Sequence, residues 1–379
     1  MVATGAPQPS SSLARRNDGD HRRRGGTMPR TRSSRPTQAT IAAATGFSVP
    51  TVSKALRADS SISRKTQDIV LAAAADLGYP LPSTQDPAAE EGASPFKRIA
   101  VLFDTVNNAY ATEILGGMLR TVDELGATLQ VRHIGVSADQ MGPDATLLTR
   151  ELAARTADGA DALILVTTPV SADIVTFAHE HDLLLLSIDP ATPPPPGMVT
   201  LSATNWRGGV QAAEHLISLG HRRIGIVAGP DSSTPTIERL AGFRFACSRA
   251  GIEVDESLLT HGPYLYSTGV VHGSFLLESE NPPTAVFALN DAIAGGILEA
   301  ARRHGIRVPE GLSVIGFDDT SIASLCSPQV TVIRQPLQEI GAEAIRTVMN
   351  ALNEGRSLGS PVELQTTLVV RGSTAAPAR

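Results

Sequence analysis

The stretch SVPTVSKALRADSSISRKTQDIVLAAAADLGYP, residues 48–80, predicts two helices of different character. Ser48 can cap the first helix, because a serine oxygen accepts a hydrogen bond from a free N–H of the first turn. Pro50 is tolerated in that turn, where its missing N–H would have no intrahelical partner. Small polar residues and a lysine share this helix with an apolar side, which we predict to face inward and to consist of Val52, Ala55 and Leu56.

The second helix of the stretch is richer in alanine and other apolar residues. We predict that it begins at Ser63 and ends at Gly78, since serine caps helices and glycine commonly terminates them. Its apolar side chains recur every four residues, which is typical of one buried helix face. On this spacing the buried residues would be Ile69, Ala73 and Leu77.

Residues 37–80 together read as three short helices, the first of them TQATIAAAT, with Gly46 at the turn that follows. A three-helix unit with a glycine in the first turn and a polar, basic second helix is typical of a helix-turn-helix. The second helix of that motif enters the major groove of DNA. An ordinary three-helix cap on a larger domain is the alternative interpretation.

The totals indicate a globular protein of more than one domain. The chain has 379 residues, of which 42% are hydrophobic and 18% charged. Cys247 and Cys326 lie far apart without CxxC spacing, which argues against a disulfide framework or a zinc site and suggests a reducing, cytoplasmic compartment. No apolar run is long enough to predict a membrane span, and the start lacks the apolar segment of a secretory signal.

Charge is distributed unevenly along the chain. Residues 1–80 hold 12 Lys and Arg against 5 Asp and Glu, whereas the remainder holds 20 against 33. A basic N-terminal region on an acidic body fits contact with a polyanion such as DNA. The alternative is a basic disordered tail, because residues 1–36 alone carry a net charge of +6 and show no periodic apolar pattern.

From Lys97 onward the pattern alternates between strands and helices. The short apolar runs RIAVLF, ALILVT, LLLLSI, RIGIVA, AVFALN and SVIGFD are typical of strands buried on both faces of a parallel sheet that helices cover. Residues 81–96, which precede this body, form a linker rich in Pro, Ala and acidic residues. We therefore predict an all-α head joined by a linker to an α/β body.

The body repeats its pattern at an offset of 125 residues, which relates Gly117 to Gly242 and Gly126 to Gly251. Two similar α/β halves in tandem predict two lobes with a ligand cleft between them, outside the carboxyl ends of the strands. The predicted lobes are residues 97–203 plus 336–358 and residues 204–335 plus 359–374, with a tail at 375–379.

The sequence resembles the lactose/galactose-repressor family of bacterial transcription regulators. The resemblance covers residues 37–80 and 97–374 and rests on TGFSVPTVSKAL, ISRKTQDIVLAAAADLGYP, ERLAGFRFACSRAGI, PPTAVFALNDAIAGGILEAARRHGIRVPEGLSVIGFDD and TVIRQPLQEIGAEAI. It implies a sugar-responsive repressor of carbohydrate genes, without a cofactor. As a homodimer, the protein would place helix-turn-helix heads on a pseudo-palindromic operator DNA and a sugar effector in a type I periplasmic-binding-protein-like body.

The resemblance also implies site residues. In the second helix of the head, Val49, Pro50 and Lys54 match base-reading residues, and Thr51 and Ser53 match residues that contact the DNA backbone. The matching cleft residues suit a sugar, because carboxylates accept hydrogen bonds from hydroxyls and an aromatic face stacks on C–H surfaces. They are Asn108, Tyr110, Asp189, Arg239, Tyr264, Asn290, Asp318 and Gln335. For Asp189 and Asp318, capping of the next helix is the alternative role.

The linker departs from the family's pattern. Family members have a hinge helix here, with an Ala-Arg pair and a leucine that wedges into the minor groove. Residues 81–96, LPSTQDPAAEEGASPF, offer no such arginine or leucine in register and carry three acidic residues, which DNA repels. We therefore predict that they do not form a wedging hinge helix.

Two other classes of protein share some of these features. A sugar-binding protein of a transport system would share the body, but it would have an export signal and no head. An α/β enzyme is disfavoured because the chain contains no GxGxxG, P-loop, GxSxG or HExxH motif. The segment HEHD, residues 179–182, falls in a helical pattern before a buried strand, so we interpret it as a solvated helix end and predict no catalytic or metal-binding residues.

Overall fold

The computed structural model describes residues 37–56, 62–77, 79, 96–135, 145–355 and 357–378. The chain divides into two compact units, residues 1–92 and 93–379. The predicted basic tail, residues 1–36, and all of the predicted linker except Phe96 lie outside the described residues.

The head consists of three short helices, α1 (Gln38–Thr45), α2 (Val49–Leu56) and α3 (Arg64–Asp76). Ser63 caps α3 as predicted, since its side chain accepts a hydrogen bond from the N–H of Thr66, and Thr37 accepts one from Thr40 at the start of α1. Gly46 ends α1 with φ of 74°, a left-handed conformation that glycine adopts without strain. The three helices enclose a small core of Ile41, Val52, Ala55, Val70 and Ala74.

The prediction of the buried face of α3 was wrong by one residue. Ile69 and Leu77 are 43% and 36% exposed, whereas Val70 and Ala74 are fully buried. Both sets recur every four residues, and the run of alanines offers no bulky side chain to distinguish them. The packing of α3 against α1 and α2 therefore decides which of its faces is buried, and the spacing of its own apolar residues does not reveal this.

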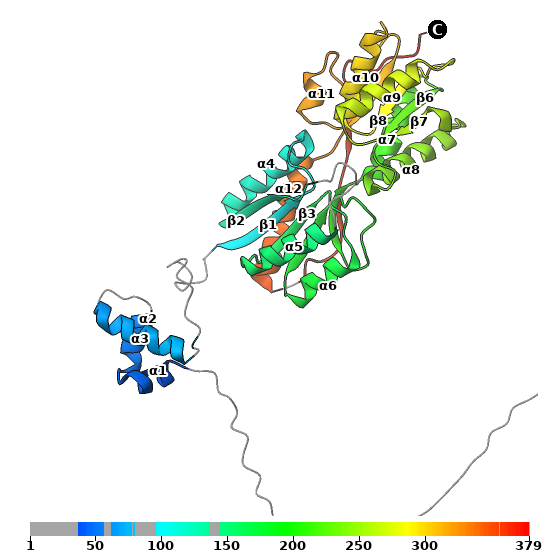
Figure 1. Ribbon diagram of the computed structural model, residues 1–379. Coiled ribbons are helices and arrows are strands. Elements are labelled where there is room, and N and C mark those ends of the chain that lie inside the picture. Colours follow the sequence, from blue (N-terminus) through cyan, green and yellow to red (C-terminus); the bar gives the residue numbers. More distant parts are fainter. Residues whose placement is uncertain are drawn as a thin grey trace, which may run out of the picture. The chain divides into compact units, whose positions relative to one another are not determined.

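The first lobe of the body is a parallel sheet in the order β11-β5-β4-β3-β1-β2, with helices on both faces (Figure 1). Its strands are β1 (Lys97–Phe103), β2 (Ala127–His133), β3 (Ala162–Val166), β4 (Leu184–Ile188), β5 (Val199–Ala203) and β11 (Val362–Leu364). Its helices are α4 (Ala109–Leu125), α5 (Ala145–Ala157), α6 (Ala172–Glu180) and α12 (Leu337–Glu354).

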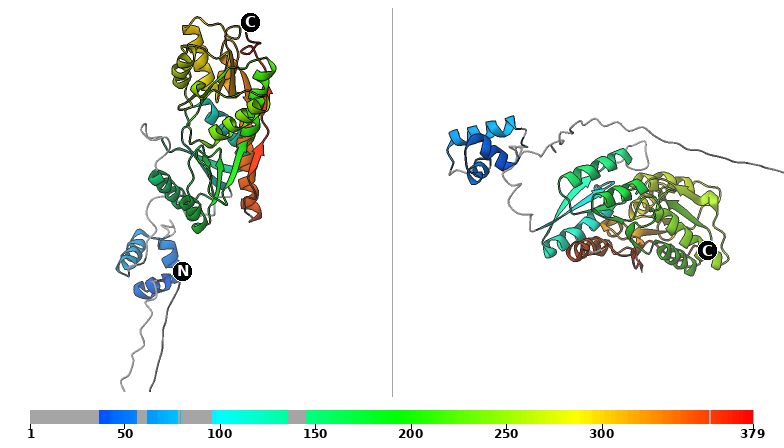
Figure 2. Two further views of the ribbon diagram at one scale, coloured as in Figure 1. Left: turned by 90° about the vertical axis from the view of Figure 1, so that its right-hand side faces the viewer. Right: turned by 90° about the horizontal axis from the view of Figure 1, so that it is seen from below.

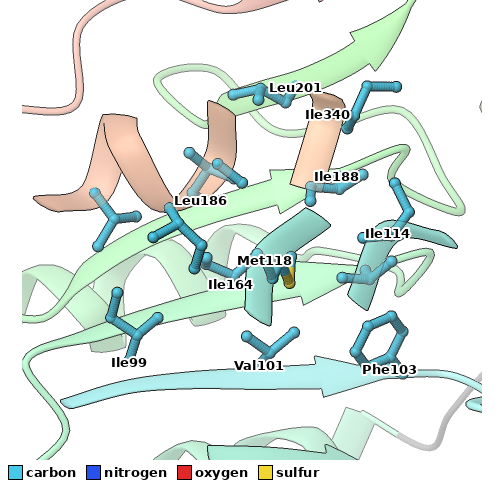
Figure 3. Packing of buried hydrophobic residues seen from close by; sticks show 14 of the residues in the cluster. Ile99, Val101, Phe103, Ile114, Met118, Ile164, Leu186, Ile188, Leu201 and Ile340 are labelled. Carbon is cyan, nitrogen blue, oxygen red and sulfur yellow. The ribbon is translucent and has the colours of Figure 1, made fainter. Parts of the chain in front are cut away.

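Alternate residues of the strands in this lobe contribute to two separate cores. Ile99, Val101 and Phe103 point to the face covered by α4 and α12, where they pack with Ile114 and Ile340 (Figure 3). The intervening residues Ala100 and Leu102 pack under α5 and α6 on the opposite face. Burial on both faces explains why these strands read as continuous apolar runs in the sequence.

The second lobe repeats this architecture, and Figure 2 shows both lobes from two further directions. Its sheet has the order β12-β10-β9-β8-β6-β7 and is parallel except for β12. The strands are β6 (Ile224–Ala228), β7 (Leu259–His261), β8 (Ala285–Ala288), β9 (Ser313–Asp318), β10 (Thr331–Arg334) and β12 (Thr367–Val369). The helices are α7 (Asn205–Ser218), α8 (Thr234–Arg249), α9 (Tyr266–Leu277), α10 (Asp291–Arg303) and α11 (Ser321–Leu325), with a 3₁₀ turn η1 (Glu256–Leu258).

Equivalent glycines mark the repeat in three dimensions. A Cβ atom at Gly117 of α4 would overlap the carbonyl oxygen of Gln338 in α12, and one at Gly242 of α8 would overlap that of Trp206 in α7. In each lobe, the helix pair therefore crosses where only glycine lets the backbones approach. This shared packing confirms that the repeated sequence pattern reflects two similar halves.

The chain crosses between the lobes after β5, after β10 and after β11. The sequence placed residues 359–374 wholly in the second lobe, and this boundary was wrong, because Val362–Leu364 pairs with β5 of the first sheet. The predicted tail at 375–379 also needs correction: the backbone N–H of Ala375 donates to the Ser313 hydroxyl in the second lobe. Within the described residues, no helix is long and apolar enough to cross a membrane.

Candidate functional site

The predicted DNA-contacting residues of the head lie on α2. Val52 and Ala55 of that helix are buried, so its opposite side remains available to a partner. Ser48 caps the start of the helix, since its hydroxyl oxygen accepts from the backbone N–H of Thr51 at 3.3 Å and lies 2.8 Å from the Thr51 hydroxyl. The predicted residues are exposed or half-buried: Val49, Pro50, Thr51, Ser53 and Lys54.

In the body, the predicted ligand residues gather at the carboxyl ends of strands from both lobes. Asp189 directly follows β4, Asp318 is the last residue of β9, and Gln335 directly follows β10. Asp189 and Asp318 have φ of 42° and 99°, backbone conformations that L-residues rarely adopt. Such conformations cost on the order of 1–3 kcal/mol and cluster at functional sites.

Tyr110 and Asp189 form the part of the site that belongs to the first lobe. The Tyr110 hydroxyl, on the first turn of α4, donates a 2.5 Å hydrogen bond to Oδ2 of Asp189. Asp189 is 2% exposed, and its burial raises its pKa from 3.8 to about 6 despite the Tyr110 hydroxyl and the positive charge of Arg239. Burial and the neighbouring Asp189 raise the pKa of Tyr110 as well, so the tyrosine stays protonated.

Arg239 organises the part that belongs to the second lobe. Its guanidinium donates to Oδ1 of Asn205 at 2.8 Å and to the carbonyl of Leu289 at 2.6 Å, and it lies 3.7 Å from the centre of the Phe317 ring. One of its nitrogens is 3.6 Å from Oδ1 of Asp318. These contacts hold a buried, planar donor group in a single orientation.

Asp318 is held by a second partner, because Nε2 of Gln335 donates to its Oδ1 at 2.6 Å. Burial raises the pKa of Asp318, and the charge of Arg239 and this hydrogen bond lower it in part. Asp291, at the start of α10, accepts hydrogen bonds from the backbone N–H and the hydroxyl of Thr320 at 2.6 and 2.9 Å. Its burial and the nearby Asp318 raise its pKa.

Several acceptor atoms of this network have no hydrogen-bond partner among the described residues. They are Oδ1 of Asp189, Oε1 of Gln335 and Oδ1 of Asp291, each completely shielded from solvent. A buried acceptor left unpaired costs about 1–3 kcal/mol. The site is therefore suited to a ligand that brings several O–H or N–H donors.

The two predicted asparagines lie at the same edge but use their oxygens to cap helices. Oδ1 of Asn108 accepts from the N–H of Ala111 at 2.7 Å, and Oδ1 of Asn290 accepts from that of Ile293 at 2.8 Å. Asp189 and Asp318 do not cap the helices that follow them, because the N-cap residues of α7 and α11 are Thr204 and Thr320. The hydroxyl of Tyr264 lies 2.6 Å from that of Thr236, and burial raises the pKa of Tyr264, which the charge of Arg239 lowers in part.

Asn205, Glu238 and Asp291 also belong to the network, and the sequence did not predict them. Nδ2 of Asn205 donates to Glu238 at 3.1 Å while its Oδ1 accepts from Arg239, so Asn205 links the two side chains. One signal was available for Asp291, which closely follows the buried strand β8 and begins α10. Asn205 begins α7 after β5, which is only partly buried and was not among the predicted strands. Glu238 has no such signal beyond its position next to Arg239.

Comparison with known proteins identifies both units. Residues 39–81 match the family described as bacterial regulatory proteins, lacI family, and residues 213–374 match a periplasmic binding protein-like domain. The transcriptional regulator DegA of Bacillus subtilis is 33% identical over 88% of this chain and 96% of its own length. A helix-turn-helix head and a two-lobed binding body thus define a ligand-responsive, DNA-binding transcription regulator.

The chain belongs to the lacI family of bacterial regulatory proteins. Solved structures agree: the CelR–cellobiose complex is 26% identical, with a TM-score of 0.66 over 89% of this chain and all of that chain. A lac repressor dimer bound to operator and the anti-inducer ONPF is 25% identical, with a TM-score of 0.65 over 90% of this chain and all of that chain. Because the chain belongs to the lacI family, the two alternative classes considered from the sequence, a transport-type binding protein and an α/β enzyme, are excluded.

Proposed function

We propose that this regulator is a repressor of carbohydrate genes and that its effector is a sugar or another polyhydroxylated molecule bound by the cleft network. The buried acceptors without partners carry this proposal, because hydroxyl groups supply the donors that Asp189, Asp291 and Gln335 lack. Arg239 and the amide of Gln335 would donate to the ligand oxygens in return. The structure of the related CelR with cellobiose supports the same class of effector. Acting on chromosomal DNA, the protein would work in the cytoplasm.

A thermal-shift screen of monosaccharides and disaccharides tests the effector class. A ligand at 100 times its dissociation constant stabilises the native state by about 2.7 kcal/mol, which is readily measured. Arg239→Ala and Asp318→Ala should abolish the response to the compound that binds wild type. An unchanged shift in both variants would contradict the assignment of the cleft.

We further propose that the protein binds its operator as a homodimer through an exposed apolar surface of the second lobe. This surface, the α9–α11 patch, contains Leu265, Tyr266 and Leu325, which are 55%, 51% and 83% exposed. Gly295 of α10 lies between them, and a Cβ atom there would touch both the Tyr266 ring and the sulfur of Cys326. Contiguous exposed apolar side chains of this kind mark interaction surfaces.

The oligomeric state tests this surface directly. Leu325→Glu should shift wild-type dimers toward monomers in sedimentation velocity, because dimerisation would bury the new carboxylate. Val370→Glu is the matched control, since Val370 is also an exposed apolar residue of the second lobe, at 61%. A monomeric wild type, or equal dissociation by both variants, would contradict the proposal.

A further inference from the structure

A small recess lies at the junction of the two lobes, lined by residues of both. Its volume is about 100 Å³, below the ~300–1,000 Å³ of whole ligand pockets, so it has room for a substituent rather than for an entire ligand. Asp189 lines the recess and also belongs to the Tyr110–Arg239–Asp318 network, so the recess borders that network. The walls of the recess include Asp189, Asn205, Thr234, Pro235, Glu238 and Glu363.

The recess is strongly acidic. Asp189 and Glu363 come from the first lobe and Glu238 from the second, so three carboxylates border one small space. Burial raises the pKa of Glu238, and the charges of Asp189 and Glu363 raise it further. Arg239 is the cation that lowers the pKa of both Asp189 and Glu238, and these carboxylates share it with Asp318, which lies 3.6 Å from one of its nitrogens.

Two side-chain oxygens at the recess also lack hydrogen bonds. These oxygens, Oδ1 of Asp189 and Oγ1 of Thr234, belong to residues that line the recess, are shielded from solvent and have no partner within the described part of the chain. A carboxylate oxygen can only accept, so a group that satisfies Asp189 must be a donor. Donor capacity and positive charge are therefore the two properties that these walls select.

We propose that the recess is a subsite for an ammonium group, and that the effector is an amino sugar or a similar polyhydroxylated amine. An ammonium group brings three donors and a compact positive charge, which suits carboxylates on several sides. A phosphate or carboxylate substituent would be repelled by the same walls. This inference rests on the proposed polyhydroxylated effector and adds the chemistry of one substituent to it.

Matched pairs of sugars test the subsite on the full-length protein. Isothermal titration calorimetry at pH 6.5, where amines are protonated, would compare glucosamine, galactosamine and mannosamine with glucose, galactose and mannose. In at least one pair, we expect the amine to bind at least about tenfold more tightly, as a hydrogen bond to a charged group allows. Glucose 6-phosphate should bind more weakly than glucose to the wild-type protein, a comparison that needs no variant.

The variant Glu238→Gln tests whether the carboxylate of Glu238 is responsible for the preference for amines. The amide keeps the shape of the side chain and an oxygen for Asn205 but removes the charge, so the amine-to-sugar affinity ratio should fall to about twofold or less. Glu310→Gln, before β9 at the opposite edge of the sheet, is the control and should preserve the ratio. If a neutral sugar binds and its amine binds no more tightly, only this inference fails. If no member of any pair binds and the thermal-shift screen of monosaccharides and disaccharides also finds no ligand, the polyhydroxylated effector fails with it.

Discussion

Asp189 should lower the stability of the folded protein at neutral pH, and Asp189→Asn should reveal this. The rise in its pKa from 3.8 to about 6 corresponds to about 3 kcal/mol, at 1.36 kcal/mol per pH unit. The substituted amide oxygen can still accept the Tyr110 hydroxyl, but its NH₂ group would lack an acceptor, which offsets about 1–2 kcal/mol. We therefore expect the variant to be about 1–2 kcal/mol more stable than wild type at pH 7 without ligand.

The pH dependence gives the sharper test of this reasoning. A carboxyl whose pKa is higher in the folded than in the unfolded state binds a proton more tightly when folded. Its destabilising effect is therefore complete above pH 6 and fades as the pH falls toward 3.8. At pH 4.5, wild type should have regained about 2 kcal/mol relative to the variant. Burial also raises the pKa of Asp104 to about 6, but both proteins retain Asp104, so its contribution cancels in the comparison.

The assay is urea denaturation of wild type and Asp189→Asn at pH 7.0 and pH 4.5, followed by circular dichroism. The advantage of the variant should disappear or reverse at the lower pH. A difference in unfolding free energy that is the same at both pH values would refute the reasoning, because it would show that the Asp189 carboxyl titrates alike in the folded and unfolded chains. The variant should also bind the effector more weakly, since the neutral amide accepts fewer hydrogen bonds.

The remaining predictions concern the head, the helix packing and the linker. Lys54→Ala should weaken binding to a selected operator by about 1–3 kcal/mol per head, whereas binding to scrambled DNA should change little. Fluorescence anisotropy measures both affinities, with Lys65→Ala as the control. Equal losses of affinity on both duplexes would exclude base reading by Lys54. Gly117→Ala should destabilise the protein by about 1–3 kcal/mol because α4 must move away from α12. Gly116→Ala should be neutral or stabilising by up to ~1 kcal/mol, because a Cβ atom there would meet only the end of the Arg120 side chain, at an ordinary contact distance of 3.9 Å. Equal melting temperatures of the two variants would contradict the contact at Gly117. Residues 81–96 should not wedge into the minor groove, so circularly permuted operator fragments should show little bending; a strong kink at the operator centre would disprove it.

Much of the architecture was predictable because its signals are local. Ser63 and Gly46 begin and end helices through hydrogen bonds and backbone conformations within one turn. The buried strands are readable for a similar reason, since burial on both faces requires a continuous apolar run whatever the neighbouring strands are. The repeat at a fixed offset then predicted two lobes, and the shared glycine contacts of Gly117 and Gly242 confirm it.

Interactions between distant segments could be decided only by the tertiary structure. Val70 rather than Ile69 is buried because the phase of α3 depends on α1 and α2, and Val362–Leu364 joins the first sheet because a three-residue strand carries no sign of its partner. The resemblance to the family indicated Asp189 and Asp318 separately, yet their common network with Arg239 exists only after the two lobes fold together. Glu238 is a similar case. The sequence shows only a charged residue in a helical segment, and the approach of Asp189 and Glu363 in the folded protein makes it one wall of an acidic recess.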